Sequence, residues 1–412
     1  MQCETRGCIL TDMLVKDKKT IISDYAVNML RPASGKAGVL FLSGGSALAE
    51  VSEHFSLCKI PSVHLITPFD SGGSSRALRI AFGMPAVGDI RNRILSLSRI
   101  DLVGHALPEL CTMRFACDGP EYERRNRLKE LCSGKHAAMM RMDASQRKQV
   151  ADLLGYLAAR LPEGFSLQGA SLGNLILVGA YLHHGFNLYA AVEHMSTLLQ
   201  VEGTVLPVVD DNLHLAASLA DGSLVVGQHL ITGKEVPAPD SPIGDIFLTP
   251  AWPETDATPR KLRPRINSRV SAFIERATCI CYPMGSFYTS LLANLLPEGV
   301  GMAISKAPCY KVYVPSAGVD PEARGLSVAD QVERLLWYLR RDAGENVAAH
   351  RLVSHIFYDS CLEYSGGIDA DKIAGLGVEL VDTDLILRSY SSSRYEPYLF
   401  MRALSDLIGL QA

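Results

Sequence analysis

The sequence lacks any apolar run long enough to form a membrane-spanning helix. Its longest apolar runs, such as Leu175–Ala180, fall far short of the roughly 20 residues that a bilayer requires. The first residues, Met1–Arg6, contain no apolar segment of the kind that a secretory signal peptide carries. We therefore expect a soluble, cytoplasmic protein with no membrane partner.

The sequence also has no excess of positively charged residues. The chain has 40 Lys and Arg residues against 44 Asp and Glu residues, a net charge of −4, so it carries no polycationic footprint for nucleic acid. None of its 10 cysteines forms a C-x-x-C pair, which excludes the common zinc and redox motifs. Cys279 and Cys281 alternate within an apolar run, so we expect them to be reduced core residues.

Several motifs that identify enzyme classes are also absent. The loop Ser43–Ser46 continues as Ala47-Leu48-Ala49, which is neither a G-x-G-x-x-G fingerprint nor a P-loop ending in Gly-Lys-Ser/Thr. No H-E-x-x-H or Gly-x-Ser-x-Gly pattern occurs. These absences disfavour a nicotinamide dehydrogenase and give no support to a zinc protease or an α/β-hydrolase.

Apolar material is abundant, at 48% of 412 residues, so the chain can bury a large core. This length allows either two or three units of about 150 residues or one large α/β domain with insertions. We predict an N-terminal extension over 1–35 and one nucleotide-binding α/β domain over 36–412. Within that domain we predict a helical insertion at about 93–165 and a proline-rich surface connection at about 235–265.

Short apolar runs bounded by glycine or proline predict buried parallel strands over 37–42, 63–67 and 277–282. A helical stretch over 47–55 completes a strand–helix–strand unit, and Asp221-Gly222 predicts a β-hairpin within 213–231. We also expect a helix over 287–296 and another that begins at a Ser327/Asp330 capping box. The pattern predicts a Rossmann-like, doubly wound, mostly parallel sheet.

Three loops rich in glycine and serine follow predicted strands, at 43–46, 70–75 and 283–289. In a parallel sheet the carboxyl ends of the strands share one edge, which is where ligands bind. Glycine lets the backbone approach a phosphate, and the N–H groups of the following helix point at it. Each loop taken alone is equally consistent with an ordinary tight turn.

Two acids and one arginine stand beside these loops. Asp70 ends the second predicted strand, and Asp89 lies at a predicted helix start, where it could cap the helix or join Asp70 in binding Mg²⁺. Arg91 could bind a phosphate or form a surface ion pair.

Other charged residues have ordinary explanations. The basic run Arg124–Lys129 is more typical of a solvated helix face than of a binding site. His183-His184 at a helix end favours an exposed role, and His214 is more consistent with a structural histidine than with a base or a ribose contact.

The order of these motifs resembles the CofD/YvcK superfamily, which contains the 2-phospho-L-lactate transferases and the gluconeogenesis factors. Asp70–Ser75 followed by Gly88–Asn92 is similar to the paired D-D-G-G-S-S and G-D-I-R-N motifs of that family. Further matching segments follow in the same order over about 37–405: Ser43–Ser46, Ser171–Leu175, Leu206–Asp210, Gly285–Ser290 and Ser327–Val332. The sequence departs from the family pattern in its first glycine loop and at Ser71, where the family has a second aspartate.

The resemblance implies Mg²⁺-dependent transfer of a phospholactyl-type group from a nucleoside diphosphate ester to an acceptor hydroxyl. The alternative is a non-catalytic regulator that binds a UDP-sugar. Asp70 and Asp89 are the candidate catalytic residues and metal ligands, and we expect a nucleotide or nucleotide-sugar ligand and a homodimer. The candidate nucleotide and phosphate contacts are Ser43, Gly44, Gly45, Ser46, Gly72, Gly73, Ser74, Ser75, Arg91, Asn92, Gly173, Asn174, Gly285, Ser286, Tyr288 and Thr289.

Overall fold

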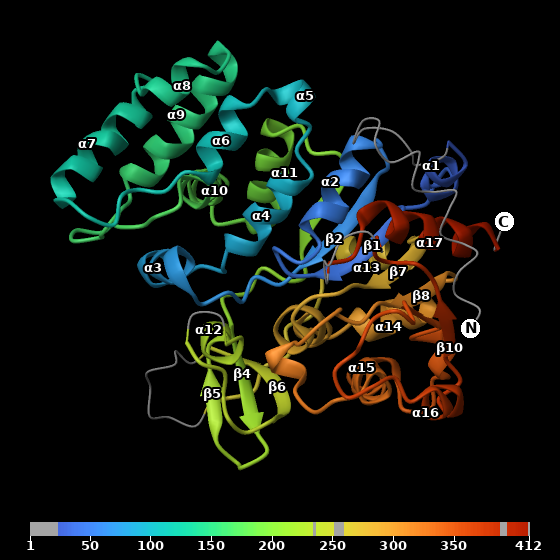
Figure 1. The fold of residues 1–412 in the computed structure, drawn as a ribbon. Helices are drawn as coiled ribbons and strands as arrows, with labels where there is room; N and C mark the ends of the chain where they lie inside the picture. The colour runs from blue at the N-terminus through green and yellow to red at the C-terminus, as the bar shows by residue number, and fades with distance from the viewer. Residues whose placement is uncertain (1–23, 234–235, 251–258, 388–393, 411–412) are drawn as a thin grey trace.

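A seven-stranded parallel sheet forms the centre of the protein, with strand order β10–β9–β8–β7–β1–β2–β3 (Figure 1). The computed structural model describes residues 24–233, 236–250, 259–387 and 394–410. The strands are β1 Val39–Ser43, β2 Ser62–Ile66, β3 Thr204–Pro207, β7 Cys279–Tyr282, β8 Tyr310–Tyr313, β9 His355–Tyr358 and β10 Glu379–Asp382. This arrangement confirms the predicted doubly wound α/β class and the strands expected over 37–42, 63–67 and 277–282.

Both faces of the parallel sheet are covered, which explains why its strands read as continuous apolar runs. Val39 and Phe41 of β1 pack under α1 (Asp24–Leu30), α2 (Ala49–Leu57) and α17 (Pro397–Gly409). Leu40 and Leu42 point to the other face. That face is covered by α13 (Ser268–Glu275), α14 (Val300–Lys306), α15 (Val328–Ala343) and α16 (Ala370–Gly375).

The core on the face of the sheet that α1, α2 and α17 cover includes part of the predicted N-terminal extension. Leu30 of α1 is fully buried against this face, so the segment from residue 24 onward packs with the domain. Residues 1–23 of the extension lie outside the described residues. Cys279 and Cys281 are both buried, as predicted from their alternation.

A group of helices with its own core lies beside the sheet, in the upper left of Figure 1. These helices include the range 93–165, where we predicted a helical insertion, and the first of them begins earlier, at Gly88. Ile66 of β2 and Val205 of β3 join this core and tie it to the sheet. The helices are α4 Gly88–Ser96, α5 Ile100–Val103, α6 Ala106–Thr112, α7 Glu121–Cys132, α8 Ala137–Met140, α9 Ala144–Ala158, α10 Leu172–His183 and α11 Leu188–Leu198. Among the described residues, no helix is both long and apolar enough to cross a bilayer.

A small antiparallel sheet, of order β5–β4–β6, lies below α3 (Gly73–Phe82) in Figure 1. Strands β4 (His214–Leu219) and β5 (Leu224–Val226) form the predicted hairpin, and Gly222 turns it with a φ of +86°. The short helix α12 (Gln228–Ile231) follows.

The third strand of this sheet, β6 (Ile243–Thr249), lies within 235–265, where we expected a surface connection. Four consecutive residues of β6, Ile246–Thr249, are buried. The prolines on both sides of the strand concealed it in the sequence. Residues 235 and 251–258 of this stretch lie outside the described part of the chain.

The predicted helix over 287–296 is not a regular α-helix. It is a π-helical turn, Phe287–Leu291, followed by a 3-10 turn, Leu292–Leu295. Two further 3-10 turns span Pro321–Ala323 and Ala349–Arg351. The capping box is confirmed: Ser327 accepts from the Asp330 N–H, and the Asp330 carboxylate accepts from the Ser327 N–H.

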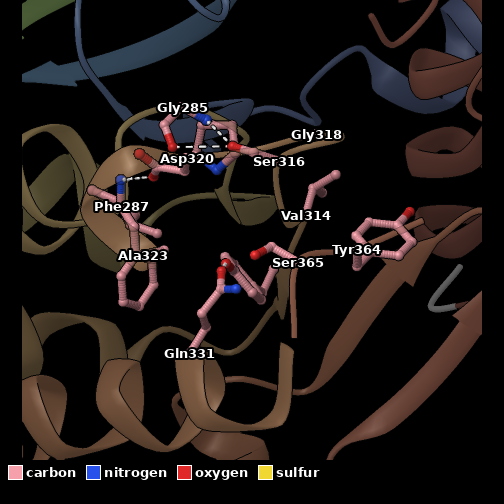
Figure 2. A pocket seen from close by; sticks show the side chains of 13 residues that line it. Gly285, Phe287, Val314, Ser316, Gly318, Asp320, Ala323, Gln331, Tyr364 and Ser365 are labelled. Atoms are coloured by element: carbon pink, nitrogen blue, oxygen red, sulfur yellow. Dashed lines mark hydrogen bonds between the residues drawn. The ribbon is translucent and has the colours of Figure 1, made fainter. Parts of the chain in front are cut away.

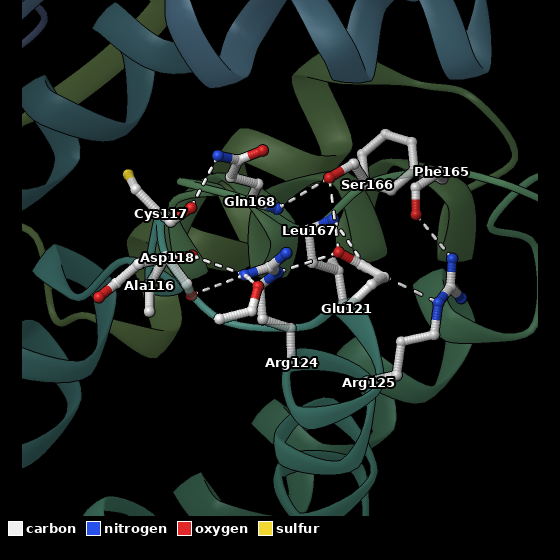
Figure 3. Close-up of polar contacts among 11 residues, drawn as sticks. Ala116, Cys117, Asp118, Glu121, Arg124, Arg125, Phe165, Ser166, Leu167 and Gln168 are labelled. Carbon is white, nitrogen blue, oxygen red and sulfur yellow. Dashed lines mark hydrogen bonds and ion pairs between the residues drawn. The ribbon is translucent and has the colours of Figure 1, made fainter.

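The basic run Arg124–Lys129 includes a buried structural arginine, so it is not solely the solvated face that we expected. Arg124 donates to the carbonyl oxygens of Ala116, Asp118 and Gly119 and to the Glu121 carboxylate (Figure 3). Arg125 donates to the Phe165 carbonyl oxygen over 2.6 Å. These contacts fix the segment that enters α7 against the segment that enters α10.

The contact between α9 and α10 depends on Gly179, and we predict that Gly179→Ala destabilises the protein. An ideal Cβ at Gly179 would lie 2.1 Å from the backbone oxygen of Leu153, so the two helices would have to separate. We expect a loss of about 1–3 kcal/mol in the free energy of unfolding, the usual cost of overpacking. Gly155→Ala on α9 is the matched control, since no atom lies within 4 Å of its added Cβ.

In the control, alanine's higher helix propensity should raise the free energy of unfolding by about 1 kcal/mol. Urea unfolding monitored by circular dichroism measures both changes. Equal effects of the two variants would contradict the close packing at Gly179.

Candidate functional site

The loops that follow β1, β2 and β7 leave the sheet at the same edge, because these three strands are parallel. This confirms the common placement predicted for the three glycine and serine loops. The chain runs from β1 outward to β2 and β3, then returns to the other side of β1 to form β7. The gap between β1 and β7 is therefore the topological switch point, where ligands bind in open α/β sheets.

The first glycine loop packs directly against the start of α4. A Cβ at Gly45 would lie 2.4 Å from Asp89 Oδ1 and 2.9 Å from Asp89 Cα. A Cβ at Gly44 would lie 2.4 Å from Ser290 Oγ and 3.7 Å from Asp89 Oδ2. Only glycine permits this close approach, and it brings the first loop, α4 and the segment after β7 together.

The two candidate acids lie on either side of Gly88. Asp70 Oδ1 accepts from the Gly72 N–H over 3.0 Å, and its Oδ2 would lie 2.8 Å from a Cβ at Gly88. The neighbouring residue Asp89 turns its carboxylate toward the first glycine loop. The N-cap of α4 is Val87, so the alternative that Asp89 caps this helix is wrong.

This donor set fits Mg²⁺ better than a softer metal. Carboxylate oxygens are the ligands that Mg²⁺ prefers, and the ion usually keeps several waters while taking one or two carboxylates. Within the described ranges, no group of three or more His, Cys, Asp or Glu side chains is arranged to hold a metal ion. A site with Asp70 and Asp89 as its protein ligands is consistent with both facts.

Arg91 is buried and connects three elements, so the alternative of a surface ion pair is wrong. Its Nε donates to Asn174 Oδ1 over 3.1 Å, and Asn174 Nδ2 donates to Ser74 Oγ over 3.0 Å. Asn174, with 1% of its surface exposed, is not the cap of α10; Ser171 accepts from its N–H instead. Gly173 makes room for the arginine, since its Cβ would lie 3.0 Å from Arg91 Cδ.

Burial lowers the pKa of Arg91, and Arg114 adds to this while Asp89 opposes it. The cationic form that a phosphate would bind is retained at neutral pH, because an arginine starts from a pKa above 12.

Arg93 is an important residue that sequence reasoning missed. Its fully buried guanidinium donates to Gly44 O over 2.8 Å, to Leu48 O over 3.0 Å and to the Ser52 hydroxyl. Its contact with Ser43 Oγ is longer, at 3.3 Å. Burial lowers the pKa of Arg93 to about 10, while the Asp89 carboxylate opposes this shift.

Arg79 of α3 holds the second loop in the same manner and was also missed. It donates to Asp70 O over 3.1 Å and to Leu213 O over 2.6 Å. Burial lowers its pKa to about 10, against the opposing effect of Asp70. The available sequence signal was a basic residue at an apolar position of a helix, such as Arg93 between Ile90 and Ile94.

The third loop already has internal partners for most of its N–H groups. The N–H of Phe287 donates to Asp320, and those of Tyr288 and Thr289 donate to Glu322, over 2.8–3.0 Å. Figure 2 shows the Phe287–Asp320 bond and the bond between Gly285 N and Ser316 Oγ, which spans 3.0 Å. These N–H groups are therefore not free to bind a ligand. The ligand contacts predicted at Gly285, Tyr288 and Thr289 remain predictions. Ser290, in contrast, lies against the first loop.

The other candidate contacts surround this arrangement. Ser46 and Gly73 are exposed at the edge, and Ser74, Asn92 and Ser286 are half-buried. Gly72 and Ser75 are buried, the latter with its Oγ beside Gly88.

His214 has the structural role that we favoured. It is buried beside Arg79, and burial followed by that charge lowers its pKa to about 3.

Comparison with known proteins identifies the family of the chain. The sequence profile of the family described as 2-phospho-L-lactate transferase CofD matches residues 39–386. The chain belongs to this CofD family. Curated relatives include a gluconeogenesis factor of Bacillus subtilis, 25% identical over 90% of this chain and 98% of its own length. A putative gluconeogenesis factor of Thermotoga maritima is 29% identical over 74% of this chain and 76% of its own length.

A solved structure supports the fold of this CofD family member. The crystal structure of a UPF0052 family protein from Bacillus halodurans matches with a TM-score of 0.61 and 23% identity. The match covers 89% of this chain and 97% of the Bacillus halodurans chain.

The contact between the glycine loop and α4 leads to a prediction about Gly45. In Gly45→Ala, the new Cβ would collide with both the carboxylate and the backbone of Asp89, so loop and helix must separate. We expect a loss of about 1–3 kcal/mol in the free energy of unfolding. The control is Ser46→Ala, at the exposed neighbouring position, which should change stability by less than about 0.5 kcal/mol. Chemical denaturation compares the two, and a Gly45→Ala protein as stable as the parent would contradict the contact.

Proposed function

We propose that the chain binds the diphosphate of a nucleotide or nucleotide-sugar at the carboxyl edge beside β1 and β7. The observation that carries this proposal is the packing of Gly44 and Gly45 against Asp89 at the switch point. The backbone of a glycine loop can approach a ligand closely, and buried cationic side chains lie next to this loop. Together they suit a ligand group with several negative charges. Of the two buried arginines on α4, Arg93 is engaged with the loop backbone and Arg91 with Asn174, so both would act mainly by charge.

We propose Mg²⁺ as the metal, with Asp70 and Asp89 as the residues that hold it. When bound, the ion would neutralise phosphate charge beside the two acids. The family description supports a reaction in which an acceptor hydroxyl attacks the phosphorus of a nucleoside diphosphate ester. The new P–O bond forms as the P–O bond between the two phosphoryl groups breaks, a nucleoside monophosphate leaves with that electron pair, and the hydroxyl proton passes to solvent. Such transfers depend mainly on positioning and charge stabilisation, which the buried arginines and the rigid loops can supply.

A second candidate function is a regulator that binds the same kind of ligand without reaction. The relatives from Bacillus subtilis and Thermotoga maritima, both described as gluconeogenesis factors, favour it. The same loops would hold the diphosphate, and the two functions differ in their dependence on the acids.

We predict that Asp70→Asn and Asp89→Asn separate the two functions. Each substitution keeps the shape of the side chain but removes a negative charge and one metal-ligating oxygen. Under the transfer function, Mg²⁺ should strengthen nucleotide binding in the parent, and both variants should lose that Mg²⁺ effect and the transfer activity. Nucleotide affinity in EDTA should persist. Asp371→Asn, on exposed α16, is the control and should behave as the parent does.

The measurement is a thermal-shift panel of GDP, GTP and UDP-sugars with and without Mg²⁺. A ligand present at 100 times its dissociation constant adds about 2.7 kcal/mol to the free energy of unfolding. Binding that is independent of Mg²⁺ and unchanged in both variants would favour the regulator. No stabilisation by any of these ligands would contradict the nucleotide proposal.

A further inference from the structure

A serine–histidine contact joins the small sheet to the second loop. Ser71 follows Asp70 and has no exposed surface, while His229 belongs to α12 at the end of the hairpin. Ser71 Oγ and His229 Nδ1 lie 2.8 Å apart, and the backbone N–H of His229 donates to the same oxygen over 3.3 Å. Neither residue was among the predicted site residues.

The surroundings of Ser71 determine which ring nitrogen of neutral His229 carries the proton. Ser71 Oγ accepts the His229 N–H, and His229 Nδ1 is the one acceptor within reach of its hydroxyl proton among the described residues. A fully buried hydroxyl that donates to nothing would be costly, so the hydroxyl donates to Nδ1. Nδ1 is then unprotonated, and the hydrogen-bond network assigns the proton of the neutral ring to Nε2.

The Nε2–H group is accessible and has no partner within the described part of the chain. His229 is half-buried, and its Nε2 is not among the buried polar atoms that lack a partner, so it retains contact with solvent. The adjacent Gln228 is only 8% exposed, and its Oε1 is a buried acceptor without a hydrogen bond. His229 thus offers an unused donor next to the second loop.

We propose that His229, with its Nδ1 held by the Ser71 hydroxyl, donates a hydrogen bond from its Nε2–H group to a phosphate oxygen of the bound ligand. This inference rests on the proposed function in one respect, because it assumes that the ligand's phosphate lies at this edge. Ser71 acts as a positioning residue, because it fixes the ring and its proton but does not touch the ligand.

The direct test is NMR of the full chain with ¹⁵N-labelled histidines. Long-range ¹H–¹⁵N spectra at neutral pH should show His229 in the Nε2–H form, and inorganic pyrophosphate or GDP should shift its Nε2 resonance. In Ser71→Ala the hydrogen bond to Nδ1 is lost, so the Nδ1 resonance should move toward that of a histidine whose ring contacts only water. His350, on the exposed turn Ala349–Arg351, is the internal control whose resonances should not move.

Binding measurements with pyrophosphate test the role of the donor. His229→Gln places an amide N–H near the position of Nε2 and should bind within about threefold of the parent. His229→Leu should bind about tenfold more weakly or worse, the loss expected for a hydrogen bond to a charged group. His350→Leu should bind as the parent does.

The outcomes separate this inference from the proposed function. The inference would be overturned, even if GDP binds, by either of two results. One is an Nδ1–H form of His229. The other is an Nε2 resonance that shifts with neither pyrophosphate nor GDP. Equal binding of pyrophosphate by the parent and by a folded His229→Leu would overturn it as well. The contact between Ser71 and His229 would then have only a structural role, joining the small sheet to the second loop. GDP and UDP-sugars that bind no better than pyrophosphate would instead overturn the nucleotide proposal, while a shifted Nε2 resonance would still support the phosphate contact.

Discussion

Buried guanidinium groups at the carboxyl edge hold the first two loops of the candidate site in place. Arg93 has no exposed surface, so its charge must be satisfied by oxygen atoms that the fold places around it. Those oxygens belong to Gly44, Leu48 and Ser52, which fixes the first glycine loop and the start of α2 against α4. Removal of one partner from such a buried charge commonly costs about 3–5 kcal/mol, so the loop cannot move without a large penalty.

The second loop is also held by a buried arginine, whereas the third loop is held by carboxylates. Arg79 binds the backbone at Asp70 and Leu213, which joins the second loop to the segment that follows β3. In the third loop, the carboxylates of Asp320 and Glu322 accept the N–H groups that a phosphate would otherwise bind. The protein's own anions therefore already occupy the start of the π-helical turn, and the proposed ligand would be left with the first two loops.

The parts of the fold that could be predicted are those governed by local pattern. The strand over 37–42 was evident because both of its faces are buried, and the hairpin was evident because Asp221-Gly222 suits a tight turn. The π-helical turn at Phe287 could not be predicted, because Asp320 and Glu322 lie more than thirty residues later in the chain. The same limit applied to the site: glycine and aspartate motifs indicated the edge, whereas the partners of Arg93, Asn174 and Ser71 depend on tertiary contacts.

Charge balance at this edge explains why a cation suits the proposed ligand. Arg79, Arg91 and Arg93 contribute three positive charges, and each is close enough to Asp70 or Asp89 for that carboxylate to raise its pKa. The two acids offset two of those charges, which leaves about one to meet a diphosphate that carries two or three negative charges. A divalent cation between the acids and the diphosphate would supply the missing positive charge, so the charge balance of the acids and arginines supports the proposal of Mg²⁺ more directly than the glycine loops do.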